Sequence, residues 1–309
     1  MRVLVTGANG FVGRYVCDAL QTAGHAVTAV GGPSESKGWH VDLTDASAVM
    51  QLVKTISPDL VLHLAAQSSV ARAWRAPQTT MEINTLGSLA VWEAAVHSGV
   101  AHMVYVSTAE VYQPVGPPAL LDENSALGPI NPYGVSKLAT ETLLSQIQVT
   151  TSTALTVIRP FNHVGPGQQK GFVFQDVATQ IADIHRGTSN AIHVGNLSPI
   201  RDFLDIRDVA RAYVMLVEHS ELTGVYNLCS GVPRSIKTVV AEMLRLSQLD
   251  PSVLIIDPDK LRPADTPYLV GNPTLFEDQI GWQPMIPWDQ TLSDILANTL
   301  NSSLHASSK

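Results

Sequence analysis

Short apolar runs alternate with longer amphipathic stretches through the first half of the chain. The apolar runs are typical of strands buried on both faces, and apolar residues three and four positions apart are typical of helices. The pattern predicts strands over 3–6, 26–30, 60–63, 103–107 and 154–158, and helices over 11–23, 46–56, 78–97 and 132–146. Strands that alternate with helices in this way predict a Rossmann-type α/β fold, a doubly wound parallel sheet.

The second half of the chain is less regular and is rich in proline and glycine. It predicts helices over 172–186, 206–218, 236–246 and 288–298, and short strands over 191–194, 225–228 and 253–256. We interpret residues 1–160, with returning segments near 203–228, as a dinucleotide-binding domain. Residues 161–309 then form mainly a smaller α/β lobe over the carboxyl ends of the strands, where ligands bind in such folds.

Three glycines follow the first predicted strand, in the segment Gly7-Ala-Asn9-Gly10-Phe11-Val12-Gly13. The first glycine permits a tight turn, the second lets the backbone approach a pyrophosphate, and the third allows a helix to pack closely on a strand. The amides that begin the next helix then face the phosphates. This segment therefore predicts a dinucleotide site formed by Gly7, Asn9, Gly10, Phe11, Val12 and Gly13.

Tyr133 and Lys137 are four positions apart in a predicted helix, so their side chains lie on one face. A phenol ordinarily keeps its proton up to a pKa of about 10. A nearby ammonium favours the phenolate, so we expect Lys137 to lower the pKa of Tyr133. Such a phenol can exchange a proton with a carbonyl or alcohol oxygen. Since any helix can carry this spacing by chance, it gains weight only beside the glycine-rich turn.

Composition narrows the remaining classes of function. The chain has 309 residues, of which 45% are hydrophobic and 15% charged, with a net charge of -8 and no basic run. Binding to nucleic acid is therefore not expected, and no apolar stretch is long enough to predict a membrane span. Cys17 and Cys229 are the two cysteines, and their spacing suits neither a disulfide framework nor a zinc site. We expect no metal and a cytoplasmic location.

Taken together, several motifs resemble those of the extended short-chain dehydrogenase/reductases, a family that largely modifies nucleotide sugars. The motifs are the three glycines, Asp42-Leu43, His63-Leu64-Ala65-Ala66, Ser107-Thr108 and Tyr133-x-x-x-Lys137. Arg159 to Gln168, Gly171-Phe-Val173, Gly195-Asn-Leu197, Arg201-Asp-Phe203, Asp205 to Asp208 and Arg262 to Asp265 are similar to the GDP-mannose branch, and the first of these to its GDP-4-keto-6-deoxy-D-mannose reductases. The resemblance covers nearly the whole chain.

The resemblance implies a role for each matched residue. Tyr133 is the acid that protonates the new alkoxide, Lys137 holds the nicotinamide ribose, and Thr108 hydrogen-bonds the keto oxygen. For Thr108 the alternative is a hydroxyl that satisfies an amide at the strand end. Asn84 either braces the site or is a buried structural amide. Asp42, Leu43, Leu64, Ala65 and Ala66 complete the expected cofactor site.

Glu110 leaves the reaction open. Dehydratases of the family carry glutamate at this position as the base that removes the sugar C5 proton. Those dehydratases carry an acid partner at the preceding position, whereas this chain has Ala109 there, which has no proton to give. Glu110 is therefore a catalytic candidate, with a solvated loop carboxylate as the alternative. His163 lies in a loop marked by Gly165 and Pro166, and we expect it to be structural or to line the substrate.

The end of the second predicted strand bears on the choice of cofactor. Enzymes that prefer NAD place an acidic residue there to bind the ribose 2′-hydroxyl, whereas this chain has Gly31-Gly-Pro-Ser34. Ser34, Ser36, Lys37 and Arg14 supply hydroxyls and cations that suit a 2′-phosphate. We therefore expect NADP(H) rather than NAD(H), with both possible. The alternative is that Lys37 and Arg14 are ordinary surface charges.

For the substrate, Asn162 and Arg201 match family positions that grip the pyrophosphate of a sugar nucleotide, and Arg262 matches one near its phosphate or ribose. The expected reaction is the NADPH-dependent reduction of the C4 ketone of a GDP-4-keto-6-deoxy-hexose, which gives a GDP-6-deoxy sugar of the rhamnose type. The alternatives are a GDP-mannose 4,6-dehydratase, another nucleotide-sugar dehydratase or epimerase, and a non-catalytic protein that senses dinucleotides. The resemblance also implies a homodimer formed by helices 78–97 and 132–146.

Overall fold

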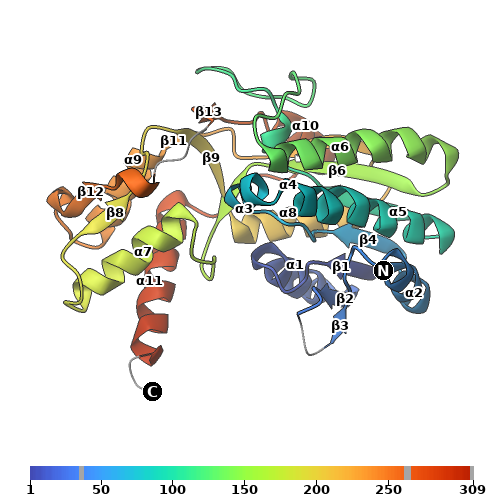
Figure 1. Cartoon of the computed structure of the whole chain (residues 1–309), viewed down its shortest axis with the longest axis horizontal. Helices are drawn as coiled ribbons and strands as arrows, with labels where there is room; N and C mark the ends of the chain where they lie inside the picture. The colour runs from blue at the N-terminus through green and yellow to red at the C-terminus, as the bar shows by residue number, and fades with distance from the viewer. Residues whose placement is uncertain (35–37, 261–265, 307–309) are drawn as a thin grey trace.

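A seven-stranded parallel sheet forms the centre of the computed structural model, which describes residues 1–34, 38–260 and 266–306, with side chains up to residue 301 (Figure 1). The strands lie in the order β10-β6-β5-β4-β1-β2-β3. Their bounds are β1 (Arg2–Thr6), β2 (Ala26–Gly31), β3 (Trp39–His40), β4 (Leu60–His63), β5 (His102–Val106), β6 (Ala154–Pro160) and β10 (Gly224–Leu228). The expected Rossmann-type sheet is confirmed, and all of its strand pairs are parallel.

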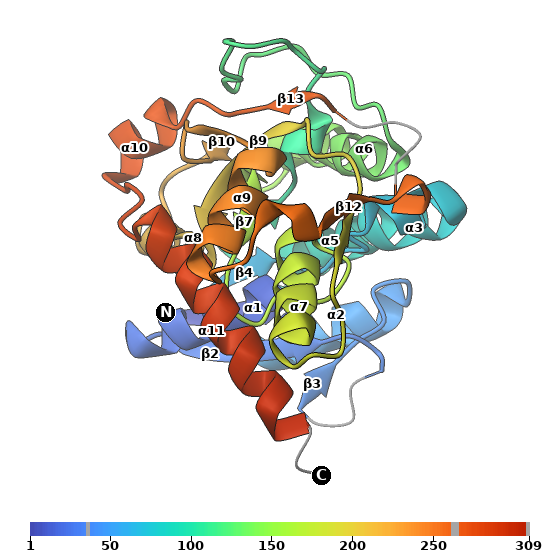
Figure 2. The ribbon, with the colours of Figure 1, turned by 90° about the vertical axis from the view of Figure 1, so that its left-hand side faces the viewer.

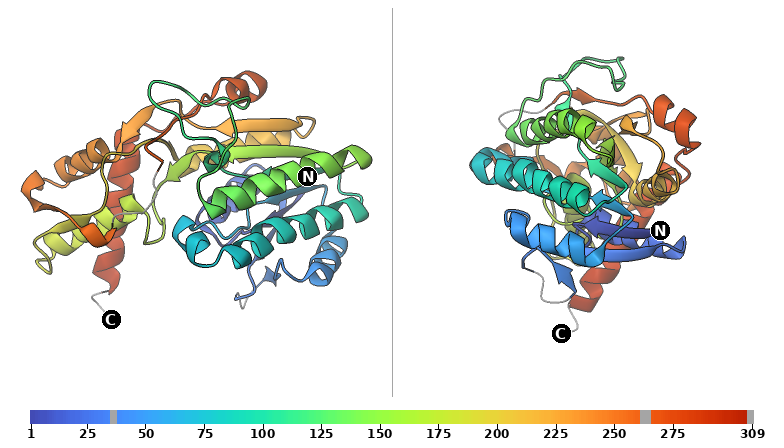
Figure 3. Two further views of the ribbon diagram at one scale, coloured as in Figure 1. Left: turned by 45° about the horizontal axis from the view of Figure 1, so that its top comes forward. Right: turned by 90° about the vertical axis from the view of Figure 1, so that its right-hand side faces the viewer.

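Helices cover both faces of this sheet because successive residues of its strands face opposite sides. Val3 and Val5 pack towards α1 (Phe11–Thr22) and α8 (Ile206–Glu218), whereas Leu4 packs towards the other layer. That other layer contains α2 (Ala46–Ile56), α5 (Gly87–His97) and α6 (Pro132–Ile147). Figure 3 shows α5 and α6 side by side over the sheet.

The chain leaves the sheet after β6 and returns to it through α8 and β10. β10 pairs in parallel with β6 over five residue pairs, from Gly224↔Thr156 to Leu228↔Pro160. Tyr213 and Leu216 of α8 pack against the residues of α1 in one core cluster. A segment from the second half of the sequence thus completes one edge and one face of the sheet.

The remaining strands belong to a smaller lobe, which faces the viewer in Figure 2. One of its sheets contains β11 (Pro233–Ser235), β9 (Ile200–Asp205) and β13 (Tyr268–Leu269), with β7 (Asn162–Val164) also paired to β9. β8 (Ile192–Val194) pairs separately with β12 (Leu254–Ile256). Three helices, α7 (Val173–His185), α9 (Ile236–Leu246) and α11 (Trp288–Ala306), enclose the core of the lobe.

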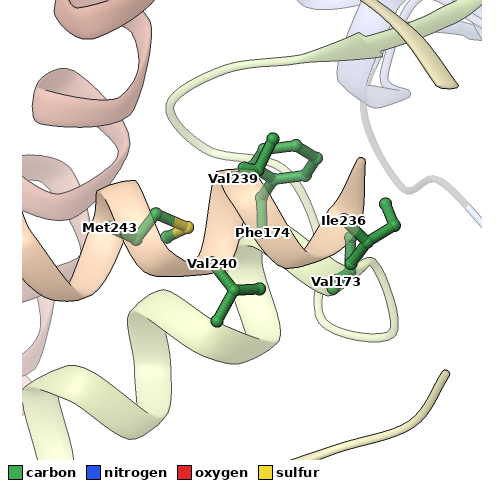
Figure 4. Close-up of a pocket in the computed structure, with 6 residues that line it drawn as sticks. All are labelled: Val173, Phe174, Ile236, Val239, Val240 and Met243. Atoms are coloured by element: carbon green, nitrogen blue, oxygen red, sulfur yellow. The ribbon is translucent and has the colours of Figure 1, made fainter. Parts of the chain in front are cut away.

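The seam between α7 and α9 is apolar and tightly packed. It is lined by Val173, Phe174, Ile236, Val239, Val240 and Met243, and it leaves no room for a water molecule (Figure 4). Burial of large side chains here fixes α9 on α7, and each buried chain of this size contributes about 1.5–3 kcal/mol. The seam therefore holds the lobe together and is not a ligand site.

The predicted helix over 78–97 is wrong in detail. The segment forms α4 (Pro77–Met81), a π-helical turn η1 (Glu82–Leu86) and then α5. The side chain of Asn84 lies in the π turn and bonds to the loop after β4 and to α6, and these bonds favour the wider turn. Such π turns are frequent at functional sites. The helix predicted over 288–298 extends to Ala306.

The sequence pattern also missed several short elements. The strands β3, β7, β9, β11 and β13 were not predicted, and neither were the helices α3 (Val70–Arg75) and α10 (Thr274–Ile280). Short 3-10 turns complete the structure: η2 (Ala109–Val111), η3 (Gln148–Thr150), η4 (Pro251–Val253) and η5 (Pro258–Lys260). Strands of two or three residues carry too few alternations to be recognised, and the six-residue β9 was missed because charged residues interrupt its apolar positions.

Candidate active site

The glycine-rich turn packs its backbone against the loop that follows β4. Gly7 has a φ of 70°, and a Cβ atom there would lie 2.8 Å from the Cα atom of Ala65. A Cβ atom on Gly13 would lie 2.2 Å from the carbonyl oxygen of Gly7. Both positions therefore exclude every side chain, and the turn brings the first residues of α1 close to Ala65.

The first turn of α1 is open to an anion. Its N-cap is Gly10, and no side chain in the described part of the protein caps it. Asn9 and Gly10 are exposed, and Phe11 and Val12 are half-buried. Free amides at the start of a helix, together with the helix dipole, form an anion-binding site. The predicted pyrophosphate-binding residues thus come together at a site with the required chemistry.

β7 and the loop that follows it lie against this end of α1, and His163 belongs to β7 and not to the loop in which it was expected. The ring of His163 stacks on that of Phe11, with their centroids 6.4 Å apart. The hydroxyl of Tyr15 donates to the carbonyl oxygen of Pro166 at 2.8 Å. Arg14 donates to the carbonyl oxygen of Gly167 at 3.4 Å. Burial lowers the pKa of His163, which opposes an acid role for this side chain and agrees with a structural one.

The residues expected around the adenosine half occupy two neighbouring loops. The carboxylate of Asp42 accepts hydrogen bonds from the amide and the hydroxyl of Thr44, and the first of these lowers its pKa most. Leu43 is buried against Gly87, where a Cβ atom would lie 2.8 Å from that of Leu43. Leu64, Ala65 and Ala66 are half-buried. Ser34 is exposed, and Ser36 and Lys37 lie outside the described residues.

Tyr133 lies in the first turn of α6, where the start of the helix is well defined. The side chain of Asn131 accepts a hydrogen bond from the amide of Gly134 at 2.8 Å, and Pro132 occupies the first helical position. Burial raises the pKa of Tyr133 to about 12, a hydrogen bond with Thr108 lowers it and the charge of Glu110 raises it further. The expectation of a lowered pKa is wrong, because burial disfavours the phenolate.

Lys137 lies one turn further along α6 and is buried. Its ammonium donates to the carbonyl oxygen of Val106 at 2.7 Å, and it lies 4.8 Å from the centre of the Tyr105 ring. Burial lowers the pKa of Lys137 to about 7, although the charge of Glu141 opposes this shift. The structure therefore brings the expected lysine to the end of β5, beside the residues that precede Thr108.

Thr108 and Glu110 flank the phenol from the loop after β5. The hydroxyl of Thr108 accepts a hydrogen bond from the amide of Glu110 at 3.2 Å, which is the structural role considered for it, and it also bonds with Tyr133. The carboxylate of Glu110 accepts a hydrogen bond from the side-chain amide of Asn131 at 2.9 Å. Glu110 is thus held beside Tyr133 and is not a free loop carboxylate.

A buried network of polar side chains supports the catalytic helix from behind. The amide group of Asn84 donates to the hydroxyl of Ser136 at 2.9 Å and to the carbonyl oxygen of Gln67 at 3.1 Å. The amide of Gln67 in turn donates to the side-chain oxygen of Asn84 at 2.8 Å. Asn84 therefore ties the loop after β4 to α6, which supports the bracing role expected for it.

His63 is a further buried member of this region whose role was not foreseen. Its two ring nitrogens bond with the hydroxyls of Thr6, at 2.7 Å, and Ser88, at 2.9 Å. Burial lowers its pKa to about 3, and the charge of Lys137 contributes. A neutral His63 therefore connects β1, β4 and α5 behind Lys137. The sequence signal was the polar residue that ends an otherwise apolar strand.

The expected substrate residues lie on the lobe. Asn162 is exposed on β7, and Arg201 is buried on β9, where it donates to the carbonyl oxygen of Ile200 at 3.0 Å. Arg262 lies outside the described residues. A second arginine, Arg234 of β11, stands directly opposite Arg201 in the antiparallel register, and no motif had pointed to it.

The described residues form neither a metal site nor a membrane-spanning helix. No cluster of histidine, cysteine, aspartate and glutamate in this part of the protein is arranged to hold a metal ion. None of the described helices has the length and apolar character required to cross a membrane.

The chain is similar to proteins of known activity over almost its full length. The NAD dependent epimerase/dehydratase family matches residues 3–229. A GDP-6-deoxy-D-mannose reductase from Pseudomonas aeruginosa is 37% identical over 96% of each protein. A GDP-mannose 4,6-dehydratase from Yersinia enterocolitica is 24% identical over 97% of this chain and 94% of its own.

Solved structures give the same result. A structure of RMD from Pseudomonas aeruginosa in complex with NADPH superposes with a TM-score of 0.85, at 36% identity, over 97% of this chain and 99% of its own. A UDP-glucose 4-epimerase from Thermus thermophilus in complex with NAD superposes with a TM-score of 0.87, at 26% identity, over 97% and 99%. Similar proteins thus bind either dinucleotide.

Proposed function

We propose that the chain, which belongs to the NAD dependent epimerase/dehydratase family, is an NADPH-dependent reductase. Its substrate is a GDP-4-keto-6-deoxy-hexose, whose C4 ketone becomes the alcohol of a GDP-6-deoxy sugar. The similarity to GDP-6-deoxy-D-mannose reductase supports this substrate. The observation that carries the reaction is the position of the Tyr133 phenol beside the hydroxyl of Thr108, with Lys137 one turn away.

The residues present suit a dinucleotide cofactor. Gly7 and Gly13 cannot carry a side chain, and the uncapped first turn of α1 offers free amides to a pyrophosphate. Val30 and Gly31 end β2 without a carboxylate, which favours the 2′-phosphate of NADPH over a ribose hydroxyl. When bound, NADPH supplies the hydride for the reduction.

The protein groups supply the proton and orient the ketone. A pKa of about 12 keeps Tyr133 protonated at neutral pH, and this is the state required to protonate an alkoxide. Each of the two hydroxyls has one proton to donate, so when the substrate binds both can donate to the keto oxygen in place of the bond between them. Both hydroxyls then act where negative charge develops.

The contacts of Glu110 support a second candidate, a 4,6-dehydratase of the same branch. Its carboxylate is fixed by Asn131 beside the phenol, where a C5 base would be required. The preceding residue is Ala109, which is 1% exposed and has no proton to donate to a leaving hydroxyl. Elimination of water from C5 and C6 needs such an acid, so reduction remains the better supported reaction.

On the substrate side, we propose that residues 161–309 form mainly the nucleotide-sugar lobe. Asn162 and Arg201 bind the pyrophosphate, and Arg262 binds near the phosphate or the ribose. A guanidinium suits phosphate because its planar fork donates two parallel hydrogen bonds. We also propose a cytoplasmic homodimer formed by residues 78–97, which contain η1 and α5, and by α6. Leu86 of η1, which is 59% exposed, and Val135 of α6, which is 45% exposed, support an apolar contact there.

The test compares products from two substrates. Purified protein with NADPH should convert GDP-4-keto-6-deoxy-mannose to the GDP-6-deoxy sugar, whereas protein given GDP-mannose without a reductant should leave it unchanged. Conversion of GDP-mannose to the keto sugar would instead assign the dehydratase. NADH in place of NADPH should give slower turnover.

Tyr133→Phe is the matched variant, since it removes one oxygen and keeps the ring. Loss of a general acid lowers turnover by about 10²–10⁴-fold. Fluorescence titration with NADPH should show nearly unchanged cofactor binding. Full turnover by Tyr133→Phe would refute the assignment of the acid.

A further inference from the structure

Two arginines face each other across neighbouring strands of the nucleotide-sugar lobe. Arg234 of β11 is the register partner of Arg201 of β9, in an antiparallel pair. Side chains of directly opposed residues lie on one face, with their Cβ atoms about 5 Å apart, and like charges in this arrangement destabilise a sheet. A structure keeps such a pair only where other interactions outweigh the repulsion.

The described residues around Arg234 hold its guanidinium without satisfying it. The group lies over the ring of Trp288, 4.4 Å from the ring centre. One of its terminal nitrogens, Nη1, is fully buried and has no hydrogen-bond partner among the described residues. Burial lowers the pKa of Arg234. Buried polar atoms are nearly always paired, so the described residues leave the hydrogen bonding of this guanidinium incomplete.

The nearest acids are committed elsewhere. The carboxylate of Asp202 accepts hydrogen bonds from the amides of Ser230 and Gly231, each at 2.8 Å. Glu242 accepts a hydrogen bond from the indole of Trp288 at 2.8 Å. Both charges favour the ionised form of Arg234, but neither acid forms a hydrogen bond with it in the described structure. Arg234 is half-buried, so a negatively charged hydrogen-bond acceptor on a ligand can pair with its charge.

The pairing of the two arginines favours a ligand that carries phosphate groups. Phe203, two residues after Arg201 and on the same face of β9, stacks on Trp288 with 5.9 Å between ring centroids. Arg201, Arg234 and Trp288 thus line one side of the lobe. Two guanidiniums about 5 Å apart at their Cβ atoms can share two neighbouring phosphate groups, because each fork binds phosphate in a bidentate manner.

We propose that Arg234 is a substrate-binding residue that pairs with the diphosphate of the sugar nucleotide, in addition to Arg201. This role rests on the proposed function for the class of substrate, though not for the base. Trp288 holds the guanidinium in place before the substrate arrives. Such preorganisation reduces the entropy lost when a flexible side chain is fixed on binding.

Calorimetric titration of the full chain with GDP, UDP and inorganic pyrophosphate tests the proposal. Arg234→Met keeps an apolar stem over Trp288 and removes the charge, so GDP binding should weaken by about 10- to 100-fold, as expected for a hydrogen-bonded charge. Binding of UDP should weaken by the same factor. Arg234→Lys should give a smaller loss. The KM for the keto sugar should rise with little change in kcat.

Two controls separate binding from folding. NADPH affinity should stay unchanged in both variants. Arg245→Gln removes another arginine of the lobe, one that is 64% exposed and lies beside Asp289, and it should bind GDP as the unmodified protein does. GDP affinity close to that of the unmodified protein in Arg234→Met would overturn the proposal. If Arg234→Met failed to fold, an unchanged GDP affinity in Arg234→Lys would overturn it.

The outcome is also distinguishable from failure of the proposed function. If the unmodified protein bound UDP more tightly than GDP, the GDP-sugar substrate would be wrong. The effect of Arg234→Met would then be measured with UDP, and an equal loss of affinity would still support the role of Arg234.

Discussion

Glu141→Gln tests how much the buried ion pair between Glu141 of α6 and Arg159 of β6 stabilises the fold. Glu141 follows Lys137 by one helical turn, and Arg159 of β6 binds its carboxylate from two sides. The guanidinium Nε lies 3.2 Å and 3.1 Å from the two carboxylate oxygens, and Nη2 lies 2.6 Å from one of them. The side chain of Arg159 is 5% exposed and that of Glu141 is 7% exposed. The substitution keeps the shape of Glu141 and removes only its charge.

The expected loss of stability follows from this geometry. Arg159 retains hydrogen bonds to the hydroxyl of Tyr112 at 3.1 Å and the carbonyl oxygen of Glu123 at 3.2 Å, but no countercharge. Removal of one partner of a buried ion pair costs about 3–5 kcal/mol of folding free energy. For a protein of this size the fall in Tm is on the order of 10 °C.

Thermal unfolding followed by circular dichroism measures this effect. The double variant Glu141→Met with Arg159→Met removes both charges and fills the space with apolar atoms, so it should recover most of the lost stability. A Glu141→Gln protein as stable as the unmodified one would refute the reasoning. So would a double variant less stable than the single variant, because the pair would then not be coupled.

Two further predictions concern the same region. Burial is the main cause that lowers the pKa of His63 from 6.5 to about 3. The unfolded chain therefore binds a proton first as the pH falls, and the stability of the fold decreases from about pH 6.5 downwards. In urea titrations at neutral and mildly acidic pH, His63→Gln should lose less stability on acidification than the unmodified protein, and equal losses would contradict the assignment. Asn131→Ala should cost about 1 kcal/mol of folding free energy through loss of the cap on α6, and it should lower turnover by releasing Glu110. Asn131→Asp should keep the cap. Thermal unfolding measures the first effect and turnover the second, and unchanged turnover in Asn131→Ala would count against a role for Glu110.

Much of the fold was predictable because its signals are local. Buried parallel strands such as β1 and β4 are nearly continuous apolar runs, and the glycines at 7, 10 and 13 mark one kind of turn. The pattern could not show the π turn at Asn84, since it arises from hydrogen bonds to Gln67 and Ser136, which are distant in sequence. Periodicity describes an element, and contacts between elements decide its local geometry.

The smaller lobe was harder to predict for the same reason. Arg234 belongs to a strand of three residues, and its significance comes from the register that places it opposite Arg201. Neither residue carries that information alone, because register depends on how β11 pairs with β9. A single arginine in a segment rich in loops would ordinarily be interpreted as a surface charge.

The pKa values of the catalytic pair show most clearly where reasoning from spacing fails. The spacing of Tyr133 and Lys137 suggested a charged lysine that stabilises a phenolate. Burial acts on both groups, however, and favours the neutral form of each: it raises the pKa of Tyr133 to about 12 and lowers that of Lys137 to about 7. The phenol is therefore protonated at neutral pH, and this follows from burial, which the spacing of the two residues could not reveal.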